Sequence, residues 1–239
     1  MEVRGKVVLI TGASEGIGSA TARRFAAEGT KLALLARSAD ALTKLADELQ
    51  AQGAEAIAAP ADMRDPEQVK KAVAKTADHF GRIDILINNA GQSVIGRIEE
   101  LNLDHFRQII ELNIIGPVAA MQAVIPIMRE QGGGIIINVS SMVSKMKLQW
   151  LAGYACTKSA LNMITDTARD ELAPDNIRVI SIFPRTTATD FHVHALGGAP
   201  GRQRPTPTRT GPVIIDTPEH VADRILDAAI NEPNDQYMD

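Results

Sequence analysis

The chain of 239 residues is 45% hydrophobic, which is enough for a sizeable core, and we expect a single domain over residues 1–239. Its net charge of −4 and its intermixed acidic and basic residues argue against nucleic acid or an anionic membrane as the main partner. The single cysteine, Cys156, excludes an internal disulfide, and no segment has the pattern of a signal peptide or a membrane span, so we expect a cytoplasmic protein.

Short apolar runs alternate with longer amphipathic segments along most of the chain. This is the pattern of a parallel sheet that helices cover on both faces. We therefore predict an α/β fold, a doubly wound, Rossmann-like domain whose mostly parallel sheet has six or seven strands. Six strands are predicted, at Val7–Ile10, Leu32–Ala36, Ala54–Ala59, Ile83–Ile87, Ile135–Val139 and Arg178–Phe183.

The first predicted strand leads directly into a glycine-rich turn, Thr11–Gly18, and then into a predicted helix at Ser19–Glu28. Glycines permit a tight turn and a close approach of the backbone to a pyrophosphate, and a helix N-terminus offers free N–H groups to it. The alternative is a turn that merely needs small residues. We expect a dinucleotide to bind here, against Gly12, Ser14, Glu15, Gly16, Ile17 and Gly18.

Arg37 follows the second predicted strand, nineteen residues past Gly18, where an acid would bind the ribose 2′-hydroxyl of NAD. A guanidinium can hold a 2′-phosphate through two hydrogen bonds, whereas a carboxylate would repel it. The sequence therefore favours NADP(H) over NAD(H). Against this, Glu15 brings an unfavourable charge to the glycine turn, and Arg37 could simply be solvated at the sheet edge.

Helix start signals follow the third predicted strand. Asp65, Pro66 and Glu67 have the pattern of an N-cap, a first-turn proline and an early acid. Asp62 has two open interpretations, a second cap or a contact with the cofactor.

Tyr154 and Lys158 are four residues apart on a predicted helix, so their side chains can lie side by side. An ammonium at ~4 Å in an effective dielectric of ~20 contributes about 4 kcal/mol, or roughly three pKa units. We therefore expect Lys158 alone to bring the phenol close to neutrality, where it can act as a general acid or base. Cys156, between them, is expected to pack as a small buried side chain.

The composition changes at Pro184, because six of the twelve prolines fall in the stretch from Pro184 to Pro218, both included. We predict a long irregular substrate loop at about residues 184–217, then a helix from about Pro218 to Asn231 and a short acidic tail. His192 and His194 lack companion ligands, so no metal site is predicted. Three loop arginines have two open interpretations, contact with an anionic substrate or plain solvation: Arg202, Arg204 and Arg209.

Taken together, the motifs resemble those of the short-chain dehydrogenase/reductase family from Lys6 to about Glu232. The motifs that carry the resemblance are Thr11–Gly18, Asn88-Asn89-Ala90-Gly91, Asn113, Ser141 and Tyr154-x-x-x-Lys158. The resemblance implies that Tyr154 exchanges a proton with the substrate oxygen, Ser141 hydrogen-bonds that oxygen, and Lys158 holds the nicotinamide ribose. Asn113 would anchor a water that connects Lys158 to solvent.

The resemblance also implies cofactor contacts outside the glycine turn. Asp62 would contact adenine, and Asn89 to Gly91 would line the adenine ribose. Thr189 would hydrogen-bond the nicotinamide side. The predicted catalytic set is Asn113, Ser141, Tyr154 and Lys158, and the further cofactor-binding residues are Arg37, Asp62, Met63, Asn89, Ala90, Gly91, Pro184 and Thr189.

Two positions keep an alternative explanation, and one departs from the family. Asn113 could be a kink partner for Pro117, and serines at a strand end could satisfy backbone groups, although spacing favours Ser141 as catalytic and Ser140 as structural. Arg185 stands where many members have glycine, so its side chain must point elsewhere or contact a ligand.

We expect an NADP(H)-dependent oxidoreductase that interconverts a ketone or aldehyde and its alcohol, as a homotetramer or homodimer built through the helices that hold Asn113 and Tyr154. The alternative, motivated by Arg185, is a dinucleotide-binding scaffold or redox sensor with little catalysis. Five side chains are expected either to line an apolar substrate pocket or to serve the core or a subunit interface: Met142, Met146, Leu148, Trp150 and Phe191.

Overall fold

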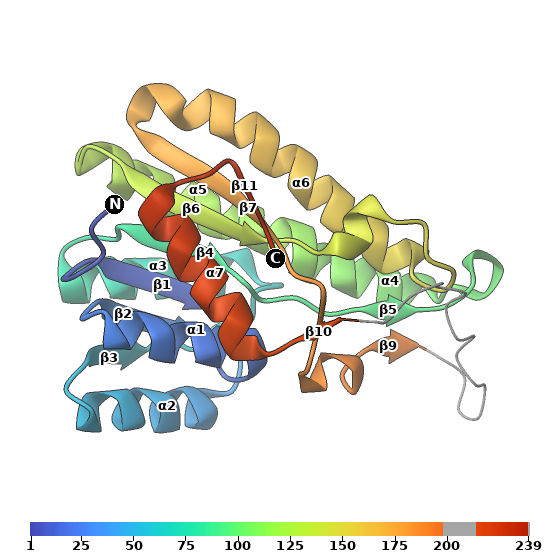
Figure 1. The fold of residues 1–239 in the computed structure, drawn as a ribbon, viewed down its shortest axis with the longest axis horizontal. Helices are drawn as coiled ribbons and strands as arrows, with labels where there is room; N and C mark the ends of the chain where they lie inside the picture. Colours follow the sequence, from blue (N-terminus) through green and yellow to red (C-terminus); the bar gives the residue numbers. More distant parts are fainter. Residues whose placement is uncertain (198–213, 239) are drawn as a thin grey trace.

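Seven parallel strands form the central sheet, in the order β11-β7-β6-β4-β1-β2-β3 (Figure 1). The structure is a computed structural model and describes residues 1–197 and 214–238. The strands are β1 Val7–Thr11, β2 Lys31–Leu35, β3 Glu55–Ala58, β4 Ile85–Asn88, β6 Gly134–Val139, β7 Ile177–Phe183 and β11 Asp235–Tyr237. The predicted doubly wound α/β fold is confirmed, and the six predicted strands differ from the observed ones by a residue or two at their ends.

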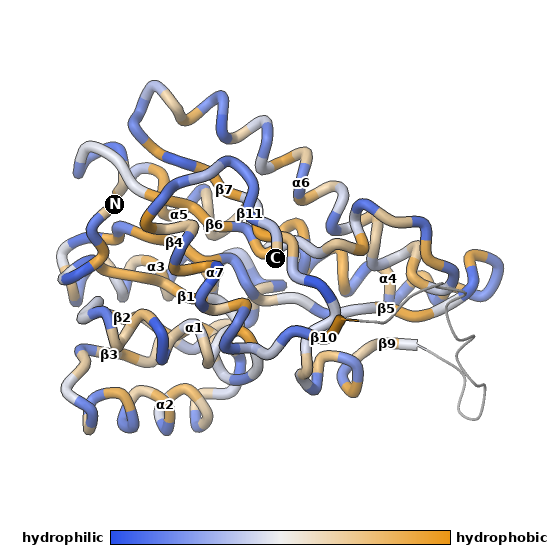
Figure 2. Tube along the Cα trace, viewed as in Figure 1, coloured by the Kyte–Doolittle hydropathy of each residue, from blue (hydrophilic) through white to orange (hydrophobic). Residues whose placement is uncertain are grey.

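Helices cover both faces of the sheet because successive strand residues point to opposite sides. In β1, Val8 and Ile10 belong to one core, and Leu9 belongs to the other. Figure 2 shows the hydrophobic residues concentrated along central strands such as β1, while the outer helices alternate in polarity. The first face carries α1 Gly16–Ala27, α2 Ala39–Ala51 and α7 Pro218–Asn231, and the second carries α3 Pro66–Phe80, α5 Gly116–Glu130 and α6 Ala152–Leu172.

Local signals place two helices where they were predicted. Asp65 caps α3 by accepting hydrogen bonds from the backbone N–H groups of Glu67 and Gln68, at 3.0 and 3.2 Å. Helix α7 has the predicted bounds, and the Thr217 hydroxyl caps it. Of the two aspartates that were candidates for a cap, Asp65 fills that role.

The seventh strand was missed, because the sequence analysis predicted only an acidic tail after α7. Strand β11 has three residues and pairs with β7 at the sheet edge. Tyr237 stacks on Phe183, with ring centroids 4.8 Å apart. A strand this short has no periodicity to recognise, and it forms only because β7 offers it an unpaired edge.

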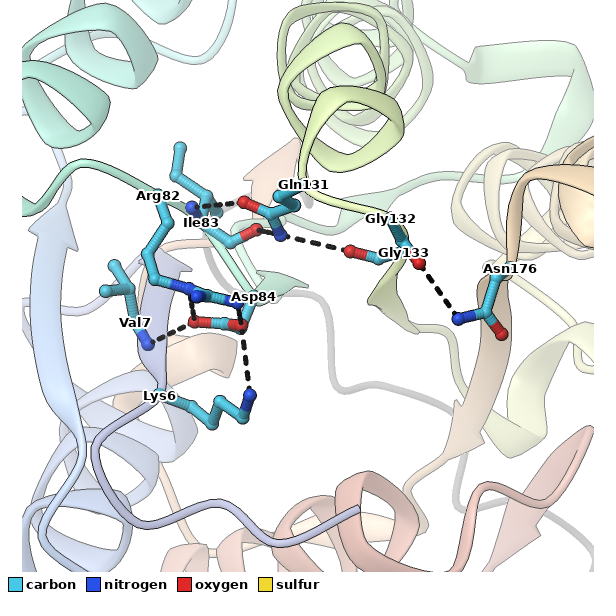
Figure 3. Close-up of polar contacts among 9 residues, drawn as sticks. All are labelled: Lys6, Val7, Arg82, Ile83, Asp84, Gln131, Gly132, Gly133 and Asn176. Atoms are coloured by element: carbon cyan, nitrogen blue, oxygen red, sulfur yellow. Dashed lines mark hydrogen bonds and ion pairs between the residues drawn. The ribbon is translucent and has the colours of Figure 1, made fainter.

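A polar network holds the N-terminal ends of the central strands in register (Figure 3). Asp84, 3% exposed, accepts hydrogen bonds from Val7 N at 2.9 Å and from Arg82 Nε and Nη2 at 2.9 and 2.6 Å. The Gln131 side chain accepts from Ile83 N and donates to Ile83 O. Because these contacts align β1 with β4, the opposite, C-terminal ends of the same strands also lie at a common edge.

One continuous helical stretch within the described ranges, Leu103–Glu130, is long and apolar enough to cross a membrane by length and composition. It comprises α4 Leu103–Ile110, the π-turn η2 Glu111–Ile115 and α5. The sequence analysis predicted no such span. The contacts are those of a helix packed on a sheet, since Ala120, Val124 and Met128 are fully buried in one core of the sheet.

The predicted irregular loop contains short elements in its described parts. They are β8 Thr186–Thr187, the 3₁₀ turn η5 Asp190–His192, β9 Leu196–Gly197 and β10 Ile215–Asp216. Strand β8 pairs with β10, and β9 pairs with β5 Val94–Ile95. The expectation of no regular structure is therefore wrong for these segments, while the loop arginines Arg202, Arg204 and Arg209 lie outside the described residues.

Candidate active site

The cavity that holds the predicted residues has a volume of about 1140 Å³ and lies at the C-terminal ends of the central strands. Ligands in open α/β sheets bind at this end, where the strand order reverses, here between β1 and β4. A second hollow of about 710 Å³, between α2 and α3, contains none of the predicted residues. All predicted site residues except Gly18 and Asn113 line the large cavity: Gly12, Ser14, Glu15, Gly16, Ile17, Arg37, Asp62, Met63, Asn89, Ala90, Gly91, Ser141, Tyr154, Lys158, Pro184 and Thr189.

The glycine turn after β1 is shaped for close backbone packing. Gly12 has φ of 66°, in the left-handed region, and a Cβ on Gly18 would lie 2.0 Å from Gly12 O. The Asn89 side chain donates to Thr11 O and Gly12 O at 3.0 and 3.2 Å. Asn89 therefore fixes the turn, a role that the sequence analysis did not assign to it.

The N-terminus of α1 opens onto the cavity and has no side-chain cap, because the N-cap residue Glu15 makes no capping hydrogen bond. The first N–H groups of a helix have no intrahelical partner, and the helix dipole is positive there. These groups and the glycines fit the pyrophosphate of a dinucleotide. Gly18 does not line the cavity, because it is buried beneath it. Its lack of a side chain lets α1 pack closely against Gly12.

Two arginines surround Asp62 at the end of β3. Arg64 Nε lies 3.1 Å from both Asp62 oxygens, and Arg64 Nη2 lies 2.6 Å from Oδ2. The pKa of Asp62 is held below its usual value, chiefly by hydrogen bonding to Arg64, and Arg37 contributes a smaller charge effect. Arg37 is exposed at the edge of the cavity. The sequence analysis missed Arg64, whose spacing of two residues from Asp62 was the available signal.

Tyr154, Ser141 and Lys158 lie together on the inner wall of the cavity, at 8%, 8% and 4% exposure. The Tyr154 hydroxyl is hydrogen-bonded to the Ser141 side chain, and Lys158 Nζ donates to Val139 O at 2.8 Å. Ser140 turns away and bonds Asn162. The two serines thus take the positions that their spacing predicted, with Ser141 at the tyrosine and Ser140 in the structure behind it.

Burial moves the pKa values of the tyrosine and the lysine in opposite directions. It raises the pKa of Tyr154 to about 12, with a smaller lowering effect from Ser141, and it lowers the pKa of Lys158 to about 8. A low dielectric disfavours the charged form of each group. The expectation that Lys158 alone brings the phenol close to neutrality is therefore wrong here, because it omitted the desolvation of both groups.

Asn113 does not line the cavity but supports its wall from the π-turn η2. Its side-chain amide bonds Gln92, and Nδ2 also donates to Thr157 Oγ1 at 3.0 Å. Pro117, which has no N–H, cannot donate to the carbonyl of Asn113 four residues earlier, and this accounts for the irregular turn. A Cβ on Gly91 would lie 3.4 Å from Asn113 Oδ1 and 3.5 Å from Lys158 Nζ, so both polar atoms face Gly91.

Apolar side chains line the part of the cavity beyond Tyr154. The Phe191 ring lies 5.7 Å from the Tyr154 ring. The five residues predicted as pocket candidates all line this cavity: Met142, Met146, Leu148, Trp150 and Phe191. The sequence analysis missed four further apolar residues that line it: Ile95, Leu112, Val143 and Ile214. This surface favours an apolar ligand next to the polar Tyr154–Ser141 pair.

Two further predictions concern single residues. Cys156 is exposed, so its predicted burial is wrong, because the buried stripe of α6 passes through Tyr154 and Thr157 and leaves position 156 on the outer face. Arg185 pairs with Asp216, the last residue of β10, shortly before α7 begins. Within residues 1–197 and 214–238, no group of three or more histidine, cysteine, aspartate or glutamate side chains could hold a metal ion.

Comparisons with known proteins agree with this geometry. A family model described as short chain dehydrogenase matches residues 6–196. An uncharacterised oxidoreductase of Methylorubrum extorquens is 36% identical over 200 residues, which cover 83% of this chain and 80% of that protein.

Two solved structures share the fold over nearly their whole length. A 7α-hydroxysteroid dehydrogenase, complexed with NADH and 7-oxo glycochenodeoxycholic acid, has a TM-score of 0.85 and 28% identity, and the match covers 95% of this chain and 88% of that one. L-Sorbose reductase from Gluconobacter frateurii, complexed with NADPH and L-sorbose, has a TM-score of 0.83 and 30% identity, with 96% and 92% covered. Both cofactor types therefore occur among similar structures.

Proposed function

The chain belongs to the short-chain dehydrogenase/reductase family, as its motifs indicated, and is an oxidoreductase; from this we propose that it interconverts a ketone or aldehyde and its alcohol with NADP(H). The observation that carries the proposal is the joint placement of Ser141, Tyr154 and Lys158 on the wall of the cavity that the glycine turn also lines. A single domain over residues 1–239 would then hold both the cofactor and the substrate.

The protein side of the reaction is proton transfer and orientation. A bound nicotinamide dinucleotide supplies the hydride chemistry, which no side chain provides. Tyr154, whose pKa is raised to about 12, keeps its proton at neutral pH and can donate it to a substrate oxygen. Ser141 can hydrogen-bond and orient that oxygen.

Lys158 supports this transfer from one helical turn away. Because the pKa of Lys158 is lowered to about 8, its ammonium can give up a proton near neutral pH. That proton can replace the one that Tyr154 donates to the substrate. Lys158 also brings a positive charge to a buried wall, which favours the developing phenolate. The predicted water held by Asn113 stays a proposal within this route.

The preference for NADP(H) rests on the charges around the end of β2. Arg37 is exposed at the cavity edge and can reach an anionic ligand, and Arg64 neutralises Asp62, a carboxylate whose charge also interacts with Arg37. Two guanidiniums against one carboxylate favour the additional phosphate of NADP(H). Glu15, exposed in the glycine turn, is the opposing charge.

The substrate side of the proposal rests on the apolar wall. Met146, Trp150 and Phe191 line the same cavity as Tyr154, so we propose a small-molecule ketone or aldehyde with an apolar body as substrate. Exposed apolar side chains on α4 and α6, Leu103 and Met163, support assembly into a homodimer or homotetramer. The cytoplasmic location stays a prediction from the sequence.

The test is the loss of NADPH absorbance when the purified protein meets a panel of ketones, diketones and aldehydes, with the reverse assay on the matching alcohols and NADP. We expect turnover with at least one apolar carbonyl compound. If no compound of the panel is turned over in either direction, with NADP(H) or with NAD(H), the result would support the dinucleotide-binding scaffold or sensor. That alternative was motivated by Arg185, and the pairing of Arg185 with Asp216 removes this motive.

A further inference from the structure

Arg185 and Asp216 form an ion pair that joins the two ends of the segment between β7 and α7. Arg185 Nε lies 3.0 Å from Asp216 Oδ2, and Nη2 lies 2.7 Å from Oδ1, so the guanidinium holds both carboxylate oxygens. The Asp216 residue is 3% exposed. The pKa of Asp216 is held below its usual value, chiefly by Arg185. A two-point contact to a buried carboxylate fixes geometry as well as charge.

Backbone contacts make the pair part of a small rigid unit. Strands β8 and β10 pair in parallel, and Ala188 N donates to Asp216 O at 2.9 Å. His220 Nδ1, on the first turn of α7, lies 3.1 Å from Asp216 Oδ1. Asp216 therefore connects the segment after β7 to α7, a helix that packs on the sheet.

The same segment forms the cavity wall next to the reacting groups. Pro184 O accepts from Met142 N at 2.9 Å, directly beside Ser141. Pro184, Thr187 and Thr189 line the cavity, and Thr187 Oγ1 donates to Arg185 O at 3.2 Å. The reacting ring of a nicotinamide cofactor must lie near the Tyr154–Ser141 pair, because hydride and proton reach the same carbonyl group. The wall from Pro184 to Thr189 therefore borders the nicotinamide half of the cavity.

We propose that Arg185 and Asp216 are positioning residues that hold this wall against the nicotinamide half of the cofactor. The inference rests on the proposed function. It gives a role to Arg185, the residue that stands where many members of the family have glycine. The bland alternative is a pair that only stabilises the fold. The two differ in one respect: a positioning pair acts on the nicotinamide half of the ligand and leaves the adenosine half unaffected.

The test compares two ligands on the same variants. NADPH reaches both halves of the cavity, whereas 2′,5′-ADP reaches the adenosine half alone. For Asp216→Asn and Arg185→Met we expect NADPH affinity to fall about tenfold, with 2′,5′-ADP affinity unchanged. We expect kcat/KM to fall roughly 100-fold, as for small misplacements of reacting groups. Arg185→Lys, which keeps the charge but not the fork, should lie between these variants and the wild type.

Arg129→Met is the matched control, because it breaks an exposed pair with Asp175, 2.6 Å long, at the opposite end of the sheet. It should change neither affinity. Equal losses for both ligands in the Arg185 and Asp216 variants, or no loss for either, would overturn the positioning role. A wild-type protein that binds neither these ligands nor NADH and ADP would overturn the proposed function, and the inference with it.

Discussion

The Asn113 side-chain amide forms two hydrogen bonds with the backbone of Gln92: Oδ1 accepts from Gln92 N at 3.0 Å, and Nδ2 donates to Gln92 O at 2.9 Å. Nδ2 also reaches Thr157, which lies between Tyr154 and Lys158 on α6. Because Asn113 and Thr157 are fully buried, these bonds take the place of water for both side chains. One asparagine therefore connects the loop after β4 to the helix that carries the candidate catalytic pair.

Asn113→Leu should destabilise the protein by about 1–3 kcal/mol, because it leaves the partly buried Gln92 N–H and C=O groups and the buried Thr157 hydroxyl without that partner. Urea unfolding measures the change in the free energy of unfolding. The control is Asn231→Leu, which removes an exposed asparagine on α7 that pairs with Asp227 and should cost only a few tenths of a kcal/mol. Equal costs for the two variants would contradict the structural role given to Asn113.

Tyr154→Phe should lower kcat roughly 100- to 10,000-fold, which is the usual contribution of a positioned acid or base. Cofactor affinity should stay nearly intact, since only the hydroxyl is lost. Tyr237→Phe is the matched control, because Tyr237 is the other tyrosine of the chain and lies 43% exposed on β11. Undiminished turnover in Tyr154→Phe would refute its assignment as the proton donor.

Lys158→Met should change how stability depends on pH. The pKa of Lys158 is about 8 in the folded protein and 10.5 for the free side chain, so the unfolded chain binds more protons between those values. The wild type therefore gains stability as pH rises through this window, by roughly 3 kcal/mol at most. Methionine has no charge to desolvate, so the variant should lack this gain.

The measurement for Lys158→Met is urea unfolding at a series of pH values from 7 to 10.5. Its stability relative to the wild type should be highest at pH 7 and should decline across the window. Tyr154→Phe serves as the reference, because the raised pKa of Tyr154 affects stability only above about 10. A difference between Lys158→Met and the wild type that does not vary with pH would exclude a desolvated lysine.

Arg37→Asp should reverse the preference between cofactors. Loss of an arginine–phosphate contact costs roughly 1.5–3 kcal/mol, so KM for NADPH should rise about 10- to 100-fold, while KM for NADH should stay level or fall. Arg107→Asp, on the exposed surface of α4, controls for the change in net charge. A preference for NADPH that survives in Arg37→Asp would mean that another residue, such as Arg64, reads the phosphate.

The fold and most of the site were predictable because their signals are local. The glycine turn, the Asp65 cap and the Tyr154–Lys158 spacing each follow from residues within one turn or one strand. The missed features depend on contacts that are distant in sequence or on burial. Strand β11 forms against the edge of β7, Arg185 finds a carboxylate 31 residues away, and the pKa of Tyr154 follows from a desolvation that spacing does not reveal.

Met163→Arg should reduce the oligomeric state to a monomer if α4 and α6 form the subunit interface. Met163 is 67% exposed, and Leu103 and Ile115, on the neighbouring helical stretch, are 60% and 38% exposed. Exposed apolar side chains on a folded chain are typical of an interface, and a guanidinium buried in such an interface would lack a partner. Light scattering coupled to size-exclusion chromatography measures the mass. Ile230→Arg, on α7 at the other face of the sheet, should leave the mass unchanged. An equal loss of mass in both variants would contradict an interface formed by α4 and α6. A monomeric wild type would contradict any such subunit interface.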